Sequence, residues 1–584
     1  MKTFLGKYQN YILAGVYLLV LIFFVSSRYD YYFALNDDVL MKDILAGIYT
    51  GTPEPRNIQM LFPLSLFISL FYRVIPAVPW YGLFLLLCQF GSIFLIALLS
   101  LKFIRTIFKK ILLLVLQFII ITATMLEHLV FVQYTITSAM LTTAAVFCFI
   151  ASDGSAPIKA FIKANLLPII LILIAFLLRP WMLLLLLPFV LVAGIFKLSQ
   201  EKPAFTKLNF AKYFALFGVL LLMLLASQTI DLIATSSKEW RKFNQFFANR
   251  TELYDFQSIP EYDANVTFYH SLGFTYGEVN LLKNYNFGLS AKIDERTLGE
   301  IAGYAGERRN ENLSFKERFN QQLRLYAFLL TNGGEHGHYP YNSLILLGYA
   351  MLIGLANFYS RFWRSIGIIS LLISVRSLLW LFILMGERYP PRLSHSLYFI
   401  EMGILLLMIL AESVTPADKK AKSFNKSFPA VMALVALIIA LGNVPAMLNR
   451  TAAELETRET TNQAWLLMQE YTSTRPGNFY FIDVYSSVQY SEKLLAKMVK
   501  RPANYDIMGG WAVNSPLHQK KLNRLIAPEI TMFEALLRYD NVYFINDIKF
   551  DIDWLSAYYA ERGEIIAPER IDLIADKLEV YKLR

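Results

Sequence analysis

Long apolar segments alternate with short basic connections along the first 450 residues of the chain. A transmembrane helix needs about 20 mainly apolar residues. Segments near this length span roughly 11–27, 79–101, 111–127, 131–152, 164–179, 181–197, 213–235, 341–358, 365–385, 395–412 and 428–447. The pattern therefore predicts eleven transmembrane helices. Composition agrees, because only 17% of the 584 residues are charged, against about 25% in soluble domains.

The basic residues between these segments predict the orientation of the chain. Lysine and arginine gather in the cytoplasmic loops of membrane proteins. Here they gather in alternate connections, at 102–110, 159–163, 197–212, 361–364 and 419–426. We therefore expect a cytoplasmic N-terminus and an extracytoplasmic C-terminus at the cell membrane. The same clusters account for the net charge of +10 without a nucleic-acid partner.

The first outer region, 28–80, contains two shorter apolar stretches. The stretch 60–76 is interrupted by Pro63, Arg73 and Pro76. Counting it as a span would invert the charge pattern downstream, so we expect it to be interfacial or re-entrant. Before it, apolar residues recur at helical spacing over 39–48. This spacing predicts an amphipathic helix on the membrane surface that ends at Gly47.

Two further hydrophilic regions are predicted on the outer face. The loop 236–341 has helical patches around 238–249 and 313–330. In the C-terminal region, strand-like runs at 479–484, 542–545 and 578–583 alternate with helical stretches at 462–471, 491–498, 530–539 and 554–562. Strands that alternate with helices are typical of a small α/β domain.

The expected fold class is thus an α-helical polytopic membrane protein with about eleven transmembrane helices and a C-terminal extracytoplasmic α/β domain. The membrane module covers 1–448, with outer loops 28–80 and 236–341, and the α/β domain covers 449–584.

Two adjacent carboxylates, Asp37 and Asp38, follow the first apolar segment. Adjacent carboxylates repel each other, and charge near a membrane is costly without a partner. One interpretation is a solvated helix start, because Asn36 is a good N-cap and acids favour a first helical turn. The other is a site where a cation, or a group that loses a proton, lies opposite the pair.

A group of positively charged side chains is predicted on the same outer face. Arg388, Arg392 and His395 lie in the run ERYPPRLSH (387–395), whose prolines favour an extended turn. Arg179, before Pro180, makes a second outer turn of this kind. Arginine suits phosphate oxygens, so these residues are expected to bind a phosphate. Arginines that extend towards lipid headgroups are the alternative.

Three further ionisable residues precede the eighth apolar segment. Glu335, His336 and His338 lie in the run GGEHGHY (333–339), and alternate residues of an extended strand share a face. The set is consistent with a divalent cation such as Mg²⁺ or Mn²⁺, with acceptor binding, or with a polar loop; hard cations usually prefer carboxylates. Arg376, within the ninth segment, is costly in lipid and is expected to pair with Glu401 or Asp231.

The order of these features resembles the GT-C superfamily of membrane glycosyltransferases. The resemblance consists of a first helix, an outer loop that opens with Asp37 and Asp38, an amphipathic segment, about eleven spans and an outer C-terminal domain. The stretch 36–72 is also similar to uncharacterised membrane proteins of Gram-positive bacteria. The resemblance implies a polyprenyl-phosphate-sugar donor, inverting transfer, and Asp37 as general base, with Asp38 as helper or metal ligand. The Trp-Trp-Asp run of oligosaccharyltransferases does not occur in the sequence.

Sugar transfer from a lipid phosphate requires groups of these kinds. The acceptor hydroxyl loses its proton to a base, and the departing phosphate needs a cation. We therefore expect an enzyme that moves a sugar from an undecaprenyl-phosphate-linked donor to an extracytoplasmic acceptor, such as a cell-wall polysaccharide, teichoic acid or glycolipid. The alternatives are a lipid-linked glycan transporter or flippase, or a non-catalytic partner of one, and a polymerase or ligase of lipid-linked polysaccharides.

Overall fold

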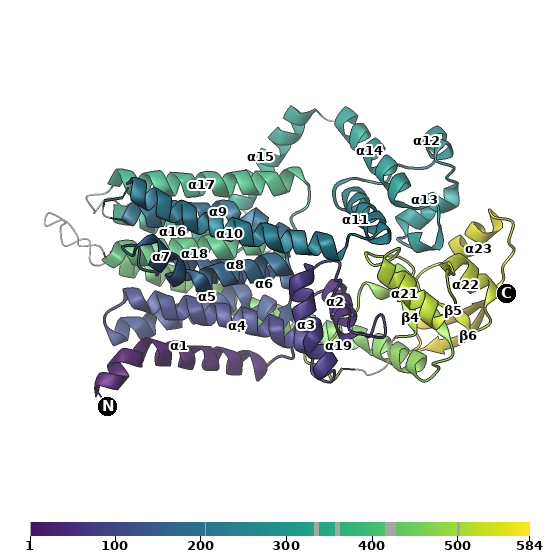
Figure 1. Ribbon diagram of the computed structural model, residues 1–584, viewed down its shortest axis with the longest axis horizontal. Helices are drawn as coiled ribbons and strands as arrows, with labels where there is room; N and C mark the ends of the chain where they lie inside the picture. The colour runs from purple at the N-terminus through teal and green to yellow at the C-terminus, as the bar shows by residue number, and fades with distance from the viewer. Residues whose placement is uncertain are drawn as a thin grey trace.

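A bundle of apolar helices forms most of the computed structural model (Figure 1). The structure describes residues 2–201, 203–204, 206–312, 314–331, 338–356, 362–414, 428–498 and 503–584. The bundle contains α1 (Lys2–Ser26), α4 (Trp80–Ser100) with the 3₁₀ turn η1 (Leu101–Phe103), α5 (Ile107–Val130), α6 (Tyr134–Ile150), α7 (Ile158–Ala164), α8 (Leu166–Leu178), α9 (Pro180–Gln200), α10 (Lys207–Ala234), α16 (Tyr341–Ala356), α17 (Phe362–Met385), α18 (Pro391–Val414) and α19 (Phe428–Ser473).

Each predicted membrane segment corresponds to a helix of this bundle. Among the described residues, eight helices are long and apolar enough to cross a membrane, and α7 with α8 forms a ninth candidate with a 54° bend. The two remaining segments are the shorter apolar helices α6 and α16. Nearly all of α6 is buried by its neighbours, so it belongs to the centre of the bundle. The protein is therefore a multi-pass membrane protein.

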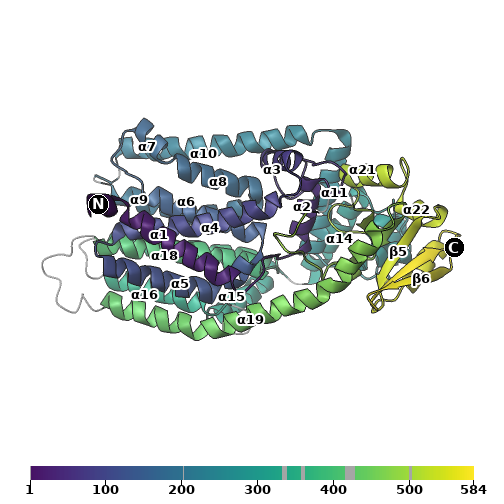
Figure 2. The same ribbon diagram turned by 90° about the horizontal axis from the view of Figure 1, so that it is seen from below.

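The first outer region lies across one end of the bundle, opposite the end that holds the N-terminus and α7 (Figures 1 and 2). It contains β1 (Tyr32–Phe33), α2 (Asn36–Ala46) and α3 (Phe62–Val74). The helix predicted over 39–48 is confirmed as α2, which ends at Gly47 with a positive φ of 80°. Its side chains Met41, Ile44 and Leu45 are buried and α2 contacts α3 and α4, so they pack inside the protein rather than on a membrane surface.

The second outer region is helical and lies between the bundle and the C-terminal domain. Its elements are α11 (Lys238–Phe256), α12 (Val266–Ser271), α13 (Tyr276–Lys283), the 3₁₀ turn η2 (Phe287–Leu289), α14 (Glu295–Asn312) and α15 (Phe315–Thr331). The helical patch predicted at 238–249 lies within α11. The patch predicted at 313–330 corresponds to α15.

The C-terminal region forms a five-stranded mixed sheet in the order β4-β3-β5-β7-β6. The strands β4, β3 and β5 are parallel, whereas β7 is antiparallel to both β5 and β6. The elements are β3 (Phe479–Ile482), α20 (Val484–Ser487), β4 (Tyr505–Ile507), α21 (Pro516–Leu525), α22 (Met532–Arg538), β5 (Val542–Asp547), α23 (Asp553–Ala560), β6 (Pro568–Ile574) and β7 (Leu578–Leu583). The predicted α/β character is confirmed.

One predicted helix of this domain is wrong. The stretch 491–498 is extended and turning. The carbonyl of Glu492 accepts a hydrogen bond from the amide of Phe33 at 3.0 Å, and the amide of Leu494 donates to the carbonyl of Tyr31 at 2.7 Å. This stretch therefore pairs with the chain around β1, and tertiary pairing overrides its local preference for a helix.

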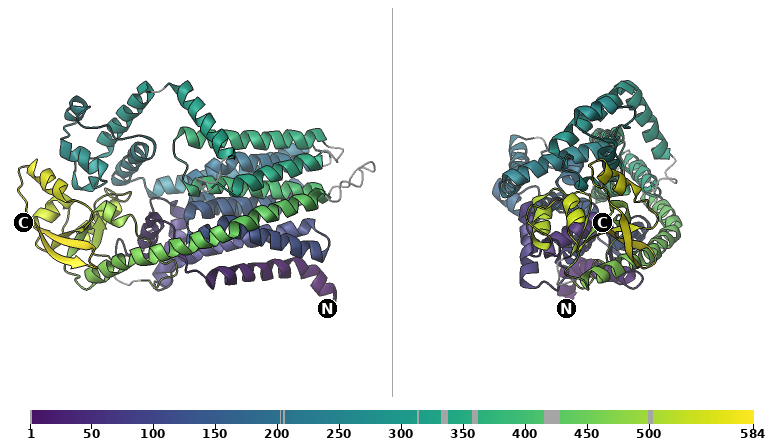
Figure 3. Two further views of the ribbon diagram at one scale, coloured as in Figure 1. Left: turned by 180° about the vertical axis from the view of Figure 1, so that it is seen from behind. Right: turned by 90° about the vertical axis from the view of Figure 1, so that its right-hand side faces the viewer.

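The last bundle helix continues into the C-terminal domain without a break. Helix α19 has 46 residues, so the expected boundary between 448 and 449 falls within it. Its later residues Ala464 and Met468 form a hydrophobic cluster with sheet residues such as Tyr480 and Ile482. The views in Figures 2 and 3 show the helix running from the bundle to the sheet.

Candidate active site

The two adjacent carboxylates lie in the first turn of α2, where the bundle meets the soluble part of the protein (Figure 1). The N-cap is Leu35, which makes no side-chain cap, so Asn36 does not have the capping role considered for it. The preceding strand β1 pairs in parallel with β2 (Phe131–Val132), and the amide of Ala34 donates to the carbonyl of Val132 at 2.9 Å. These contacts fix the start of α2 beside the junction of α5 and α6.

The two carboxylates have different surroundings. Asp38 is fully buried, and the hydroxyl of Tyr81 donates to its Oδ1 at 2.8 Å. Burial raises the pKa of Asp38 well above its usual range; the Tyr81 hydrogen bond and the more distant charge of Arg392 oppose this rise, and Asp37 adds to it. Asp38 is therefore held in its neutral form over a wider pH range than an exposed aspartate. A fully solvated helix start does not describe this pair.

Asp37 is only half-buried and receives a hydrogen bond from the C-terminal domain. The indole Nε1 of Trp511 donates to its Oδ1 at 3.0 Å. Trp511 is nearly buried, with 8% exposure, so the indole is held in place by packing. A residue more than 470 positions away in sequence thus orients the carboxylate.

A close backbone approach holds the segment that carries Trp511. The amide of Gly288 donates to the carbonyl of Met508 at 2.9 Å. A Cβ on Gly509 would lie 1.6 Å from the carbonyl oxygen of Tyr285, so a side chain there would force the two segments apart. Glycine at 509 therefore lets the second outer region and the C-terminal domain meet beside Asp37.

Arg388 lies close enough to three other arginines and to Asp37 for their charges to act on it. Burial lowers the pKa of Arg388, the charges of Arg392, Arg250 and Arg179 lower it further, and Asp37 opposes them. The ring of Tyr134 marks the same place, because the charges of Arg179, Arg392, Asp37 and Asp38 all act on its hydroxyl. We call Arg179, Arg250, Arg388 and Arg392 the arginine cluster.

Of the predicted pair, Arg388 lies in the connection between α17 and α18, whereas Arg392 lies in the first turn of α18, so the extended turn predicted over 387–395 ends at Pro391. Arg388 forms an ion pair with Asp255 near the end of α11. The preceding Glu387 pairs with Arg309 of α14 at 2.8 Å. These ion pairs attach the α17–α18 connection to the second outer region and so help to fix the position of both arginines.

Arg179 reaches the cluster from the turn between α8 and α9. It donates a hydrogen bond to the side chain of Gln59, and its guanidinium lies 5.1 Å from the ring centroid of Tyr134. Arg179 is half-buried. The structure thus places Arg179 on the same side of the bundle as the predicted pair.

Arg250 is a cluster member that the sequence reasoning missed. It lies on α11, one turn from Phe246 and one turn from Tyr254, over whose ring its guanidinium lies at 5.5 Å from the centroid. Burial lowers its pKa, and Tyr254 and Asp37 oppose this effect. Its Nε is buried and has no hydrogen-bond partner among the described residues. The sequence did contain one indication of this role: Arg250 lies one helical turn from each of the aromatic residues Phe246 and Tyr254.

His395 lies in a different set of contacts from the arginine cluster. Its Nδ1 is 2.7 Å from Nε2 of His128, and its ring packs 4.6 Å from that of Tyr341. The side chain is buried in the bundle. The contacts shown for His395 are with helices α5 and α16, rather than with Arg388 or Arg392.

Of the three residues considered for a metal or acceptor, the structure describes His338 alone. Glu335 and His336 lie outside the described residues. His338 is buried, with its Nδ1 3.0 Å from the hydroxyl of Tyr398. Within the part of the chain that the structure describes, no group of three or more His, Cys, Asp or Glu residues is arranged to hold a metal ion.

Arg376, expected to pair with Glu401 or Asp231, forms a buried ion pair with Glu401.

Comparison with known proteins gives a structural likeness at low identity. The chain is similar to ArnT from Cupriavidus metallidurans in a crystal structure of its apo state, with a TM-score of 0.40 and 11% sequence identity over 99% of this chain and 98% of that chain. No protein-family model matches the sequence, and no curated protein matches it. The function proposed below therefore rests on the side chains around Asp37.

Proposed function

We propose that this protein is a glycosyltransferase of the GT-C type, which moves a sugar from a polyprenyl-phosphate-linked donor to an extracytoplasmic acceptor. One observation supports the proposal: the charge of the half-buried Asp37 acts on Arg250 and Arg388 of the arginine cluster, at the end of a membrane bundle. A carboxylate is suited to take a proton from a hydroxyl, and arginines are suited to hold phosphate oxygens. A lipid phosphate at the membrane surface fits both groups.

Asp37 acts as the general base in this proposal. The acceptor hydroxyl gives its proton to Asp37 while its oxygen forms a bond to the anomeric carbon. The bond between that carbon and the phosphate oxygen breaks, and the phosphate leaves with the electron pair. The arginine cluster stabilises the charge that develops on this oxygen. The inverting outcome follows from the resemblance to the GT-C superfamily.

Asp38 supports Asp37 instead of competing with it for the proton. Its raised pKa keeps Asp38 neutral over a wider pH range than an exposed aspartate, and a neutral carboxyl is a poor base. It also has the Tyr81 hydroxyl as a fixed partner. We assign Asp38 the role of holding the first turn of α2 in place.

Among the described residues, the side chains around Asp37 suit a phosphate better than a divalent cation such as Mg²⁺ or Mn²⁺. The neighbouring cations are guanidinium groups, which have no lone pair to offer a metal, and Asp38 is buried against Tyr81. We propose that the arginine cluster supplies the positive charge for the phosphate, so that no step depends on a metal. Transfer should then persist in the presence of EDTA.

The proposed orientation places the arginine cluster outside the cell. The N-terminus and α7 lie at the opposite end of the bundle (Figure 1), where the lysine-rich connections predict the cytoplasm. The C-terminal domain would then be extracytoplasmic. The proposed partners are a polyprenyl-phosphate sugar, an envelope glycan as acceptor, and membrane lipids.

The test uses the full chain in proteoliposomes with a labelled undecaprenyl-phosphate sugar and cell-envelope glycan acceptors. Asp37→Asn should reduce transfer by about 10²–10⁴-fold, the usual contribution of a general base. Asp30→Asn is the matched control, because Asp30 lies in the same outer region and pairs with Lys493 on the surface; it should transfer normally. Full transfer by a variant that carries both Asp37→Asn and Asp38→Asn would overturn the proposal. Unchanged movement of the donor between leaflets by that variant would then favour a flippase.

A further inference from the structure

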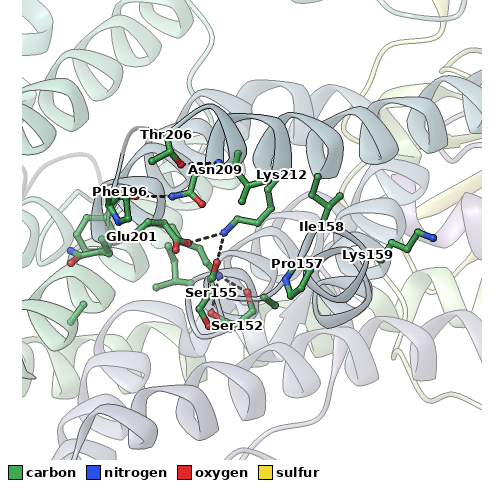
Figure 4. A pocket seen from close by; sticks show the side chains of 18 of the residues that line it. Ser152, Ser155, Pro157, Ile158, Lys159, Phe196, Glu201, Thr206, Asn209 and Lys212 are labelled. Atoms are coloured by element: carbon green, nitrogen blue, oxygen red, sulfur yellow. Dashed lines mark hydrogen bonds and ion pairs between the residues drawn. The ribbon is translucent and has the colours of Figure 1, made fainter.

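A cavity lies beside α7 (Figure 4), at the opposite end of the bundle from α2 (Figure 1). Its volume is about 1290 Å³. The loop after α6, the N-terminus of α10 and the end of α9 enclose it. A cavity of this size exceeds that of most small-molecule sites, which span about 300–1,000 Å³.

The walls of this cavity carry excess positive charge. Lys159, Lys197 and Lys212 line it together with a single carboxylate, Glu201. Three positive charges and one negative charge leave a net +2. Asp153, on the loop after α6, is exposed and accepts hydrogen bonds from Ser155, and it is not among the lining residues.

Two of the lysines are held in fixed positions by hydrogen bonds, and one of them also by an ion pair. Lys212 is 3% exposed; it donates to the carbonyl of Gly154 and pairs with Glu201 at 3.6 Å, and Figure 4 shows this ion pair. Lys197 is 5% exposed and donates to the carbonyls of Phe149 and Ser152. Carbonyl groups orient an ammonium but do not neutralise its charge, so this end of the cavity remains suited to an anion.

The remaining walls of the cavity are apolar and reach the outer surface of the bundle. Phe103, Ile150, Ile158, Phe196 and Leu208 contribute to them, and Leu208 is 68% exposed at the start of α10. Apolar walls beside a cationic end match a molecule with a charged head and hydrocarbon chains. The position at a terminus of the membrane helices places that head at the depth of lipid headgroups.

From these observations we infer that this cavity binds the phosphate headgroup of an anionic phospholipid, with Lys197 and Lys212 facing the phosphate and the acyl chains lying along Ile158 and Leu208. The site is independent of the proposed transfer, because it lies at the other end of the bundle and shares no residue with the arginine cluster. A free inorganic phosphate offers the same anionic group without the chains, so the experiment separates the two sources.

The first measurement uses native mass spectrometry of the full-length, delipidated protein in detergent. Phosphatidylglycerol should bind with an affinity about thirtyfold higher than phosphatidylcholine, because the net charge of +2 on the lining attracts an anionic headgroup. Equal binding of the two lipids would overturn the inference. Inorganic phosphate at millimolar concentration should not displace phosphatidylglycerol; complete displacement would assign the site to a soluble phosphate and overturn the lipid assignment.

Paired variants test whether the cavity itself is the site. Lys212→Gln should weaken phosphatidylglycerol binding about fivefold, whereas Lys207→Gln, on the exposed side of the same helix, should not. Lys212 also holds the loop after α6 through the carbonyl of Gly154, so its replacement changes the loop as well as the charge. A second pair of variants therefore leaves every lysine in place. Ala156→Trp fills the cavity and should abolish the preference for phosphatidylglycerol, whereas Ala160→Trp, exposed on α7, should keep it. Equal losses in a variant and its control would contradict the proposed site.

Discussion

The two ends of the bundle both gather positive charge, but they do so with different residues. At the end near α2, four arginines come from the α8–α9 turn, α11, the α17–α18 connection and the first turn of α18. At the end near α7, the buried Lys197 and Lys212 line the cavity from the neighbouring helices α9 and α10, and the buried Lys110 lies in the first turn of α5. The bias of membrane proteins towards cytoplasmic lysine and arginine accounts for the positive charge at the end near α7. It does not account for the positive charge at the end near α2.

The difference shows that net charge alone does not distinguish a place where charged side chains converge from a loop that only orients the chain. Lysines in connections orient a chain wherever they lie along the loop. The arginine cluster, by contrast, requires separate elements to bring planar, bidentate groups to one place beside a carboxylate. The predictions below change one side of this contrast at a time.

Removing one arginine from the cluster should have the largest effect. Arg392→Gln takes away the guanidinium whose charge acts on Asp38 and Arg388. Transfer, measured as kcat/KM in proteoliposomes, should fall by about 10²–10³-fold, as for the loss of one group that stabilises a developing oxyanion. Arg105→Gln is the control, because Arg105 is exposed at the other end of the bundle. An equal fall of kcat/KM in the control would show that transfer depends on the overall positive charge of the protein and not on the arginine cluster.

Keeping the charge but losing the planar fork should have a smaller effect. Arg250→Lys preserves one positive charge on α11 but removes the bidentate geometry that suits phosphate. We expect kcat/KM to fall by roughly tenfold. Arg241→Lys, exposed on the same helix, should retain wild-type transfer. Full activity of Arg250→Lys would show that Arg250 contributes only its positive charge. It would contradict the proposed need for a guanidinium at this position.

The indole that touches Asp37 should contribute less than the cluster. Trp511→Phe removes the hydrogen bond to Oδ1 while keeping an aromatic side chain. Transfer should fall about tenfold, within the range for a lost hydrogen bond to a charged group, and the thermal unfolding midpoint should change little. Trp554→Phe, elsewhere in the same domain, serves as the control. A variant with normal transfer would show that the C-terminal domain does not orient Asp37.

The smallest expected effect concerns stability and pH. Because the folded-state pKa of Asp38 lies well above the usual 3.8, the folded protein holds this proton more tightly than the unfolded chain does. The resulting stabilisation is complete below about pH 3.8 and is lost as pH rises through the raised pKa. Asp38→Asn removes the titration, so its unfolding midpoint should fall less between pH 5 and pH 8 than that of the wild type. The Asp30→Asn variant should follow the wild type; an identical pH response in all three proteins would contradict the assigned pKa direction.

The parts of the fold that follow from local composition were predictable from the sequence. Each apolar segment became a helix because its length and lack of polar groups leave few alternatives in a membrane. The strands at 479–482, 542–547 and 578–583 were likewise visible as short apolar runs. In contrast, the stretch 491–498 was misread because its pairing partner, around Phe33, lies more than 450 residues earlier.

The candidate site was predictable only in part. The positions of Asp37 and Arg388 between apolar segments pointed to one face of the membrane, and the structure brings them within electrostatic range. Nothing local in the sequence indicated Trp511, because its position depends on the packing of Gly509 against Tyr285. Arg250 was missed for a similar reason, since the folded outer region is needed to carry α11 to the cluster.

The helix α19 joins the C-terminal domain to the bundle through continuous backbone instead of a linker. Its 46 residues span roughly 70 Å at about 1.5 Å per residue, and its far end packs against the sheet. Pro445 lies within this helix, and a proline in a helix interior removes a backbone hydrogen bond and favours a bend. A change of bend at Pro445 would therefore tilt the whole sheet relative to the membrane helices.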